Sequence, residues 1–184
     1  RRAAPGDPRP DLIEARFRER EGDRKGTLAA LRRAHDKAPE ELAVTLELAR
    51  VLAVAQRGEE AQALIDGLKG LSGAQRWIER GRLRLAAGDS LGARDAFSEA
   101  VKLEPSGEAR YLLGVSLFRL GELASAESTL REAVRQDVRD FRPLALLCAL
   151  HREDLRIEDA ARDRMELLRR FPEREAEYTS ACPP

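Results

Sequence analysis

The chain has 184 residues, and its 33 basic and 33 acidic side chains give a formal net charge of zero at pH 7. A neutral chain lacks the excess of Lys and Arg on which nonspecific binding to nucleic acid or to an anionic membrane depends. No stretch approaches 18 consecutive apolar residues, so the sequence predicts no segment that inserts directly into a membrane.

The predicted elements are all helices. Residues 1–10 contain three prolines and a glycine and are predicted to be a disordered lead-in. From residue 11 to residue 172 the apolar residues fall at helical spacing, and we find no credible strand. This pattern predicts five pairs of helices, over residues 8–40, 41–72, 73–106, 107–138 and 139–172. Residues 173–184 are predicted to form a short helix and a loose C-terminal tail.

A recurring spacing supports the five pairs. One set of five residues has a counterpart 33 positions later. The first set is Gly81, Gly88, Ala93, Phe97 and Ala100, and the second set is Gly114, Gly121, Ala126, Leu130 and Ala133. A fixed period in this range is typical of a stacked array, in which each copy of a small unit buries its apolar face against the next. Glycine tolerates a positive φ, so it is predicted to end the first helix of a pair. The glycines at this place are Gly22, Gly58, Gly88 and Gly121.

The third pair carries the clearest motif. Six of its residues fit one known repeat pattern: Trp77, Gly81, Ala93, Phe97, Ala100 and Pro105. With them the chain resembles the tetratricopeptide repeat (TPR) proteins over roughly residues 8–172. The resemblance implies an all-α fold, a right-handed α-α superhelical solenoid of about five helix-turn-helix repeats. The sequence departs from the pattern at Arg80, Arg84 and Arg164, where large apolar side chains are usual, so the fifth repeat is expected to be distorted or to act as a polar cap.

The resemblance also implies a function, which is a protein–protein interaction module serving as an adaptor or scaffold. In that family the first helix of each pair lines a concave groove that binds a peptide segment or a partner protein. Aligning the repeats places an arginine at the same position in three successive repeats, at Arg16, Arg50 and Arg82. The apolar groove candidates are Leu46, Ile78, Leu85, Tyr111, Val115 and Phe118.

Arginine suits this position because its planar guanidinium pairs bidentately with carboxylates. The predicted ligand is therefore an acidic peptide segment with apolar anchors. The alternative is that the three arginines pair internally with Glu19, Glu47 and Glu79 and only brace neighbouring helices.

Residues suited to catalysis or metal binding are few. His35 is expected to be a solvated surface side chain, and Cys148 a buried packing thiol. Cys148 and His151 lie three residues apart on one helix, but two ligands do not complete a metal site, so no metal and no cofactor is expected. A disulfide between Cys148 and Cys182 would need an oxidising compartment and a tail that folds back, and we do not expect one.

Two further expectations concern the class of protein. Carboxylates pair with arginines at helical spacing, as Glu127 does with Arg131, which indicates a solvated ion-pair face and not an enzyme. The alternative function is a structural assembly part of a bacterial envelope, pilus or secretion complex that self-associates through its repeats. The chain begins at Arg1 without a methionine or an apolar signal segment, which suggests a piece of a longer protein or a processed product, in the bacterial cytoplasm or the periplasm.

Overall fold

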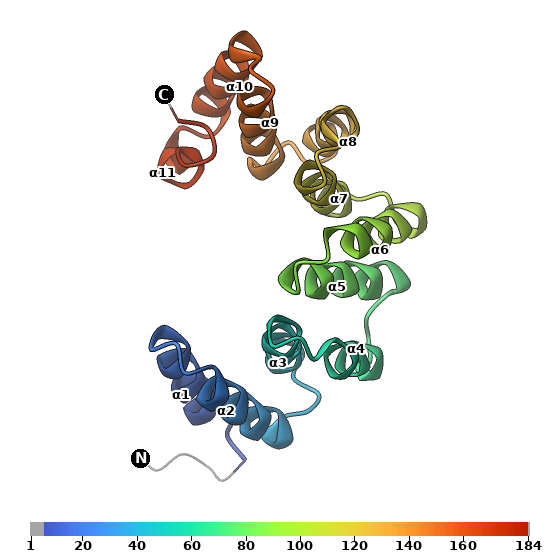
Figure 1. The fold of residues 1–184 in the computed structure, drawn as a ribbon, viewed down its shortest axis with the longest axis vertical. Coiled ribbons are helices and arrows are strands. Elements are labelled where there is room, and N and C mark those ends of the chain that lie inside the picture. The colour runs from blue at the N-terminus through green and yellow to red at the C-terminus, as the bar shows by residue number, and fades with distance from the viewer. Residues whose placement is uncertain (1–5, 184) are drawn as a thin grey trace. The chain divides into compact units, whose positions relative to one another are not determined.

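A computed structural model describes residues 6–183, and every regular element in this range is a helix (Figure 1). The predicted all-α fold is therefore confirmed. The helices are α1 (Arg9–Arg20), α2 (Arg24–Lys37), α3 (Leu42–Val54), α4 (Gly58–Gly67), α5 (Gly73–Ala86), α6 (Ser90–Leu103), α7 (Gly107–Arg119), α8 (Leu123–Gln136), α9 (Arg142–Glu153), α10 (Ile157–Arg170), the 3-10 helix η1 (Pro172–Arg174) and α11 (Glu175–Tyr178). Over the same range, none of the helices combines the length and the hydropathy that crossing a bilayer requires.

The chain divides into two compact units, the first ending at Asp89 and the second beginning at Ser90. The first unit holds α1 to α5, and the second holds α6 to α11 with η1. The division falls between α5 and α6, inside the predicted third repeat. Each of the other four predicted repeats contains two helices that pack against each other.

The turn between the two helices of a repeat contains a residue with a positive φ. Glycine fills this place at Gly22, Gly88 and Gly121, with φ of 75°, 84° and 75°. In the second and fifth repeats the place belongs to Gln56 and Leu155, with φ of 60° and 57°. The prediction that Gly58 ends the first helix of its pair is wrong, because Gly58 is the first residue of α4.

The core of the first unit is built from small and medium aliphatic side chains of α1 to α5, among them Ala15, Leu31, Leu48, Leu52 and Ile65. At the start of this unit a set of ion pairs joins α1 to α2. The carboxylate of Asp11, which is almost fully buried, accepts hydrogen bonds from Arg33 at 2.9 Å and from Lys37 at 2.6 Å. These cations, Lys37 first, hold the pKa of Asp11 below its usual value.

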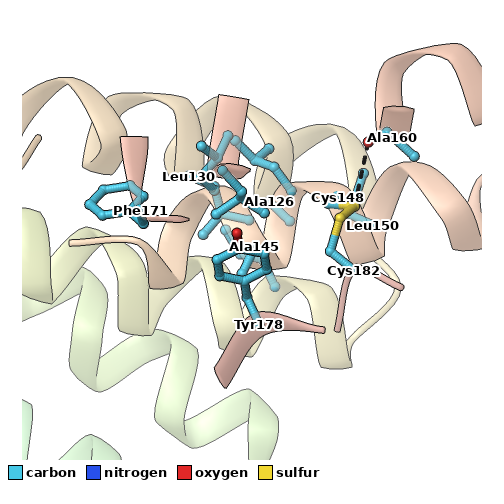
Figure 2. Close-up of a cluster of buried hydrophobic side chains, with 13 residues drawn as sticks. Ala126, Leu130, Ala145, Cys148, Leu150, Ala160, Phe171, Tyr178 and Cys182 are labelled. Carbon is cyan, nitrogen blue, oxygen red and sulfur yellow. Dashed lines mark hydrogen bonds between the residues drawn. A yellow bond between two sulfur atoms is a disulfide. The ribbon is translucent and has the colours of Figure 1, made fainter. Parts of the chain in front are cut away.

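The core of the second unit draws on α7, α8, α9, α10 and the C-terminal segment (Figure 2). Its small residues allow close approach between helices. A Cβ atom on Gly114 would lie 2.6 Å from Cδ2 of Leu130, whose side chain is fully buried. Alanine at this position would therefore require the buried side chain of Leu130 or the helices themselves to shift.

The C-terminal tail is part of this core. Cys182 forms a disulfide with Cys148 of α9, with a Cα–Cα distance of 5.5 Å, so the expectation of two unpaired cysteines is wrong. The tail folds back because Tyr178 is fully buried there, 6.2 Å from the ring of Phe141. Figure 2 shows Tyr178 beside Ala145 and the disulfide further along α9.

The predicted lead-in, residues 1–10, is only partly covered by the structure. Residues 1–5 lie outside the described range, and α1 begins at Arg9, so the last two lead-in residues are helical. The backbone N–H of Arg9 donates to Asp7, which places a carboxylate at the N-terminal end of α1. A carboxylate is favourable there because the first N–H groups of a helix have no partner within the helix.

Candidate partner-binding surface

Two adjacent hollows lie along α1, α2 and α3 in the first unit. One has a volume of about 350 Å³, and its lining includes Arg16 and Glu47. The other has a volume of about 280 Å³, and its lining includes Arg50 and Val51. Glu19 lines both. We call the two hollows together the N-terminal groove. Each is large enough to receive side chains of a peptide.

Arg16 projects from the face of α1 that carries Leu12 and Glu19, at the rim of the larger hollow. Its side chain is exposed, and it forms no ion pair with any residue between 6 and 183. Its guanidinium therefore keeps all its hydrogen-bond donors for solvent or for a ligand.

Arg50, one repeat further along the chain, is already paired. Its guanidinium donates to Glu47 at 2.6 Å and to Glu19 at 2.8 Å, which links α3 to α1. These hydrogen bonds, the one to Glu47 first, raise the pKa of Arg50 above its usual value. Arg82 on α5 likewise pairs with Glu79 at 2.6 Å. The internal pairing that the sequence offered as an alternative thus describes Arg50 and Arg82, but not Arg16.

The apolar candidates of the first unit differ in accessibility. Leu46 and Leu85 are half-buried, and Leu46 packs against the core of the unit. Ile78 is only 8% exposed, so little of its side chain is left for a ligand. Apolar surface within the N-terminal groove comes instead from Val51 and Val54, which line the smaller hollow and which the aligned repeats did not single out.

Tyr111, Val115 and Phe118 all lie on α7 in the second unit and are half-buried. Tyr111 and Phe118 pack against the core of that unit, and the guanidinium of Arg142 lies 4.9 Å from the centre of the Tyr111 ring. Burial raises the pKa of the Tyr111 hydroxyl. The structure thus gathers Arg16 and Arg50 in one unit and the three α7 candidates on one helix of the other.

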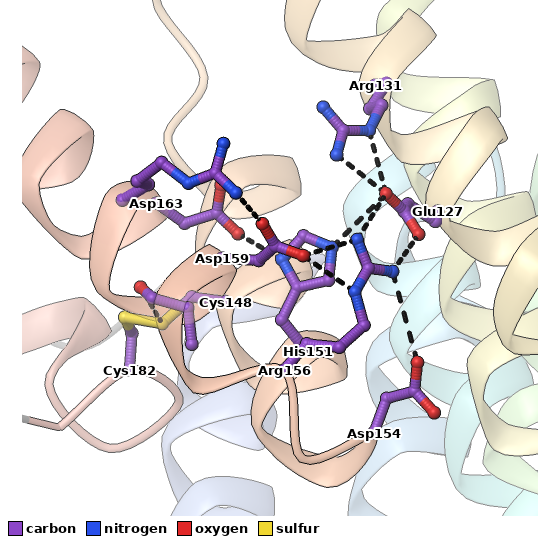
Figure 3. A network of polar contacts seen from close by, with 11 residues as sticks. Glu127, Arg131, Cys148, His151, Asp154, Arg156, Asp159, Asp163 and Cys182 are labelled. Carbon is purple, nitrogen blue, oxygen red and sulfur yellow. Dashed lines mark hydrogen bonds and ion pairs between the residues drawn. A yellow bond between two sulfur atoms is a disulfide. The ribbon is translucent and has the colours of Figure 1, made fainter.

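A second polar cluster links α8, α9 and α10 (Figure 3). Glu127 accepts hydrogen bonds from Arg156 and Arg131, both at 2.6 Å, and lies 3.3 Å from Nε2 of His151. His151 is fully buried. Its other ring nitrogen, Nδ1, lies 2.7 Å from Oδ2 of Asp163. The hydrogen bond from Arg156 is the main cause that lowers the pKa of Glu127 to about 2, whereas burial raises that of Asp163.

This cluster was only partly visible in the sequence. The helical spacing identified Glu127 with Arg131, but the contacts to Arg156 and His151 join different helices and leave no spacing signal. The disulfide did leave one, because the separation of 34 residues between Cys148 and Cys182 equals one repeat length. Among the described residues no group of three or more His, Cys, Asp and Glu side chains is placed to hold a metal ion.

His35 differs from its expected state. It is half-buried, and its Nδ1 lies 3.2 Å from the hydroxyl of Thr45 on α3, so it is not simply a solvated surface side chain. The reason is that this side of α2 faces the next helix of the array.

Three solved structures illustrate what the chain is similar to. A thermophilic TPR protein of Thermus thermophilus is 17% identical with a TM-score of 0.66, and the match covers 95% of this chain and 98% of that one. YrrB, described as a TPR protein with an unusual peptide-binding site, is 18% identical with a TM-score of 0.57, covering 91% and 88%. PilW, described as a widely conserved type IV pilus biogenesis factor, is 15% identical with a TM-score of 0.63, covering 91% and 80%. At such identities these similarities concern the fold.

Family models give the assignment. No curated protein matches the sequence significantly. Two models of the tetratricopeptide repeat match residues 20–71 and 78–139, which together make up more than half of the chain. The chain therefore belongs to the tetratricopeptide repeat family, whose repeats form helical scaffolds for protein–protein interaction.

Proposed function

We propose that this protein is an interaction module whose N-terminal groove binds an acidic peptide segment of a partner protein. The observation that carries the proposal is the pair of adjacent hollows with an exposed arginine, Arg16, at the rim, which is unpaired among the described residues. The unusual peptide-binding site described for YrrB gives the proposal a precedent on a similar fold.

Recognition by this groove would combine charge and apolar contact. A carboxylate of the peptide pairs with the free guanidinium of Arg16 in bidentate geometry. Arg50 can exchange one of its present carboxylate partners for a second peptide carboxylate, because its ion pairs are partly exposed and such pairs contribute little to stability. Apolar side chains of the peptide enter the smaller hollow against Val51 and Val54.

The second unit adds a separate surface to the proposal. Tyr111, Val115 and Phe118 present half-buried apolar faces on α7, and these suit apolar anchors of a partner. In the first unit, Arg82 and Leu85 on α5 remain candidates for contacts with the same peptide as Arg16. The exposed part of Leu46 is a further candidate. A chain with two such surfaces has the properties of an adaptor or scaffold.

A synthetic peptide array tests the proposal. The intact chain is probed with short peptides in which acidic, basic and apolar positions are varied, and the best binder is titrated by fluorescence anisotropy. We expect acidic peptides with apolar positions to bind best. The variant Arg16→Glu should weaken that binding about tenfold or more, since a hydrogen bond to a charged group contributes about 1.5–3 kcal/mol.

Arg135→Glu is the matched control, because Arg135 is an exposed arginine on α8 with no ion pair to any described residue. It carries the same change of charge on another surface. Equal losses in the two variants would show a general charge effect and contradict the proposed groove, as would an array in which acidic peptides bind no better than basic ones.

A further inference from the structure

The outer face of α10 carries an uncovered row of apolar side chains. Ile157, Ala161, Met165 and Leu168 follow one another at spacings of four, four and three residues, so they lie on one side of the helix. All four are exposed, Ile157 and Met165 to 63% and Leu168 to 37%. We call this row the α10 stripe.

The repeat register shows what this face does elsewhere in the chain. One repeat earlier, the positions equivalent to Ile157 and Ala161 are Leu123 and Glu127 of α8. Glu127 reaches His151 on α9, and Leu123 packs against the core of the unit. In the first repeat the equivalent face of α2 contributes the contact of His35 with Thr45 on α3. This face of a second helix therefore normally receives the following helix.

The C-terminal tail does not cover the α10 stripe. It is fastened to α9 by the disulfide at Cys148, and it meets α10 at Arg164, which donates hydrogen bonds to the carbonyl of Cys182 and to Glu175. Leu155, just before α10, adds a side chain that is 82% exposed in a backbone conformation that favours glycine. The described residues thus leave this apolar surface open to a partner.

The charges beside the stripe identify the occupant. Glu158 and Arg169 border it on the same edge, at opposite ends of the helix, and both are exposed without an ion pair to any described residue. We propose that α10 of one copy pairs with α10 of a second copy in antiparallel orientation about a two-fold axis. That arrangement sets Ile157 against the partner's Leu168 and Ala161 against the partner's Met165.

Antiparallel pairing also sets Glu158 of each copy against Arg169 of the partner. Parallel pairing would instead place like ends of the helix together, with acidic residues in both first turns and basic residues in both last turns. Antiparallel pairing also aligns the two helix dipoles favourably. The stripe and its charges are therefore complementary to themselves only in the antiparallel arrangement.

A head-to-tail contact with α1 of a second copy fits less well. By the repeat register, the position of His151 corresponds to Arg18 on α1, and this face of α1 also carries Asp11 and Glu14. All three are engaged in ion pairs within the first unit. Packing the α10 stripe on them would remove charged groups from water without new partners, which is unfavourable.

Sedimentation velocity of the intact, oxidised chain over a range of concentrations tests the dimer. The wild type should show a reversible monomer–dimer equilibrium. Met165→Asp should raise the dissociation constant about tenfold or more, because a carboxylate would be buried in the apolar contact. Leu103→Asp is the control, since Leu103 is 60% exposed on α6 of the same unit, and it should leave the equilibrium unchanged. Circular dichroism confirms that both variants are folded.

A charge exchange tests the orientation. Glu158→Arg and Arg169→Glu should each weaken the dimer, and the double variant E158R/R169E should restore it. A chain that stays monomeric at every concentration would overturn the proposal, as would equal effects of the two aspartate variants. Open-ended oligomers would indicate a head-to-tail contact, and failure of the double variant would exclude the antiparallel pairing.

Discussion

Leu155 has a backbone conformation that is poorly suited to its branched side chain. A residue with a Cβ atom at φ 57° is strained, and the side chain is too exposed to compensate within its own unit. We predict that Leu155→Gly raises the free energy of unfolding by roughly 0.5–1 kcal/mol, because relief of strain exceeds the entropy that glycine adds to the unfolded chain.

Urea denaturation at low protein concentration measures this change. The reverse substitution, Gly121→Leu, serves as the matched control, since Gly121 has φ 75° in the preceding repeat. It should lower the free energy of unfolding. Equal or lower stability of Leu155→Gly would mean that the side chain makes contacts that outweigh the strain.

Glu127 is the residue whose titration matters most for the second unit. Its pKa of about 2 in the folded chain lies below the usual 4.5, so the ionised carboxylate stabilises the fold above about pH 4.5. That contribution is lost as the pH falls from about 4.5 through 2. Glu127→Gln should cost about 2 kcal/mol at pH 7, because it removes the charged acceptor of the hydrogen bonds from Arg156 and Arg131.

Thermal unfolding between pH 2 and 7 checks the prediction. The difference in melting temperature between wild type and Glu127→Gln should be largest near neutral pH and should shrink towards pH 2. A difference that is constant across this range would show that the ionised carboxylate of Glu127 does not stabilise the fold.

At the scale of elements, the sequence was most informative where periodicity and turn residues agree. The helices follow from the apolar spacing, and the turns at Gly22, Gly88 and Gly121 follow from the need for positive φ. Gly58 led to a wrong prediction because glycine also tolerates the first position of a helix. The turn residue of that repeat, Gln56, has no property that marks it in advance.

The C-terminal element could not be foreseen in the same way. Its place depends on the long-range burial of Tyr178, which leaves no local pattern. It also depends on the bond from Cys182 to Cys148, for which the sequence offers only a separation of one repeat length. We predict that reduction of this disulfide lowers the stability of the second unit by about 4 kcal/mol, since the bond closes a loop of 34 residues.

Unfolding with and without a reductant measures this effect, and the double variant Cys148→Ala/Cys182→Ala should no longer respond to the reductant. A wild-type chain that is equally stable in both conditions would contradict the prediction.

At the scale of the whole molecule, the repeat register predicted which helices carry the candidate surface, but not which side chains are free. Arg16, Arg50 and Arg82 are equivalent in register, yet Arg50 and Arg82 form ion pairs and Arg16 forms none with the described residues. Ile78 was selected by the same register and is buried. Such differences depend on packing between neighbouring helices, which a column of aligned residues does not contain.

The central claim, that the N-terminal groove binds an acidic peptide, is tested most directly by mapping where such a peptide binds. Backbone amide chemical shifts of the intact, isotope-labelled chain are recorded during titration with the best acidic peptide from the array. The account predicts that the largest changes lie in α1 and α3 around Arg16 and Arg50, and that they disappear in Arg16→Glu. Changes confined to other helices, or unaltered in that variant, would contradict it.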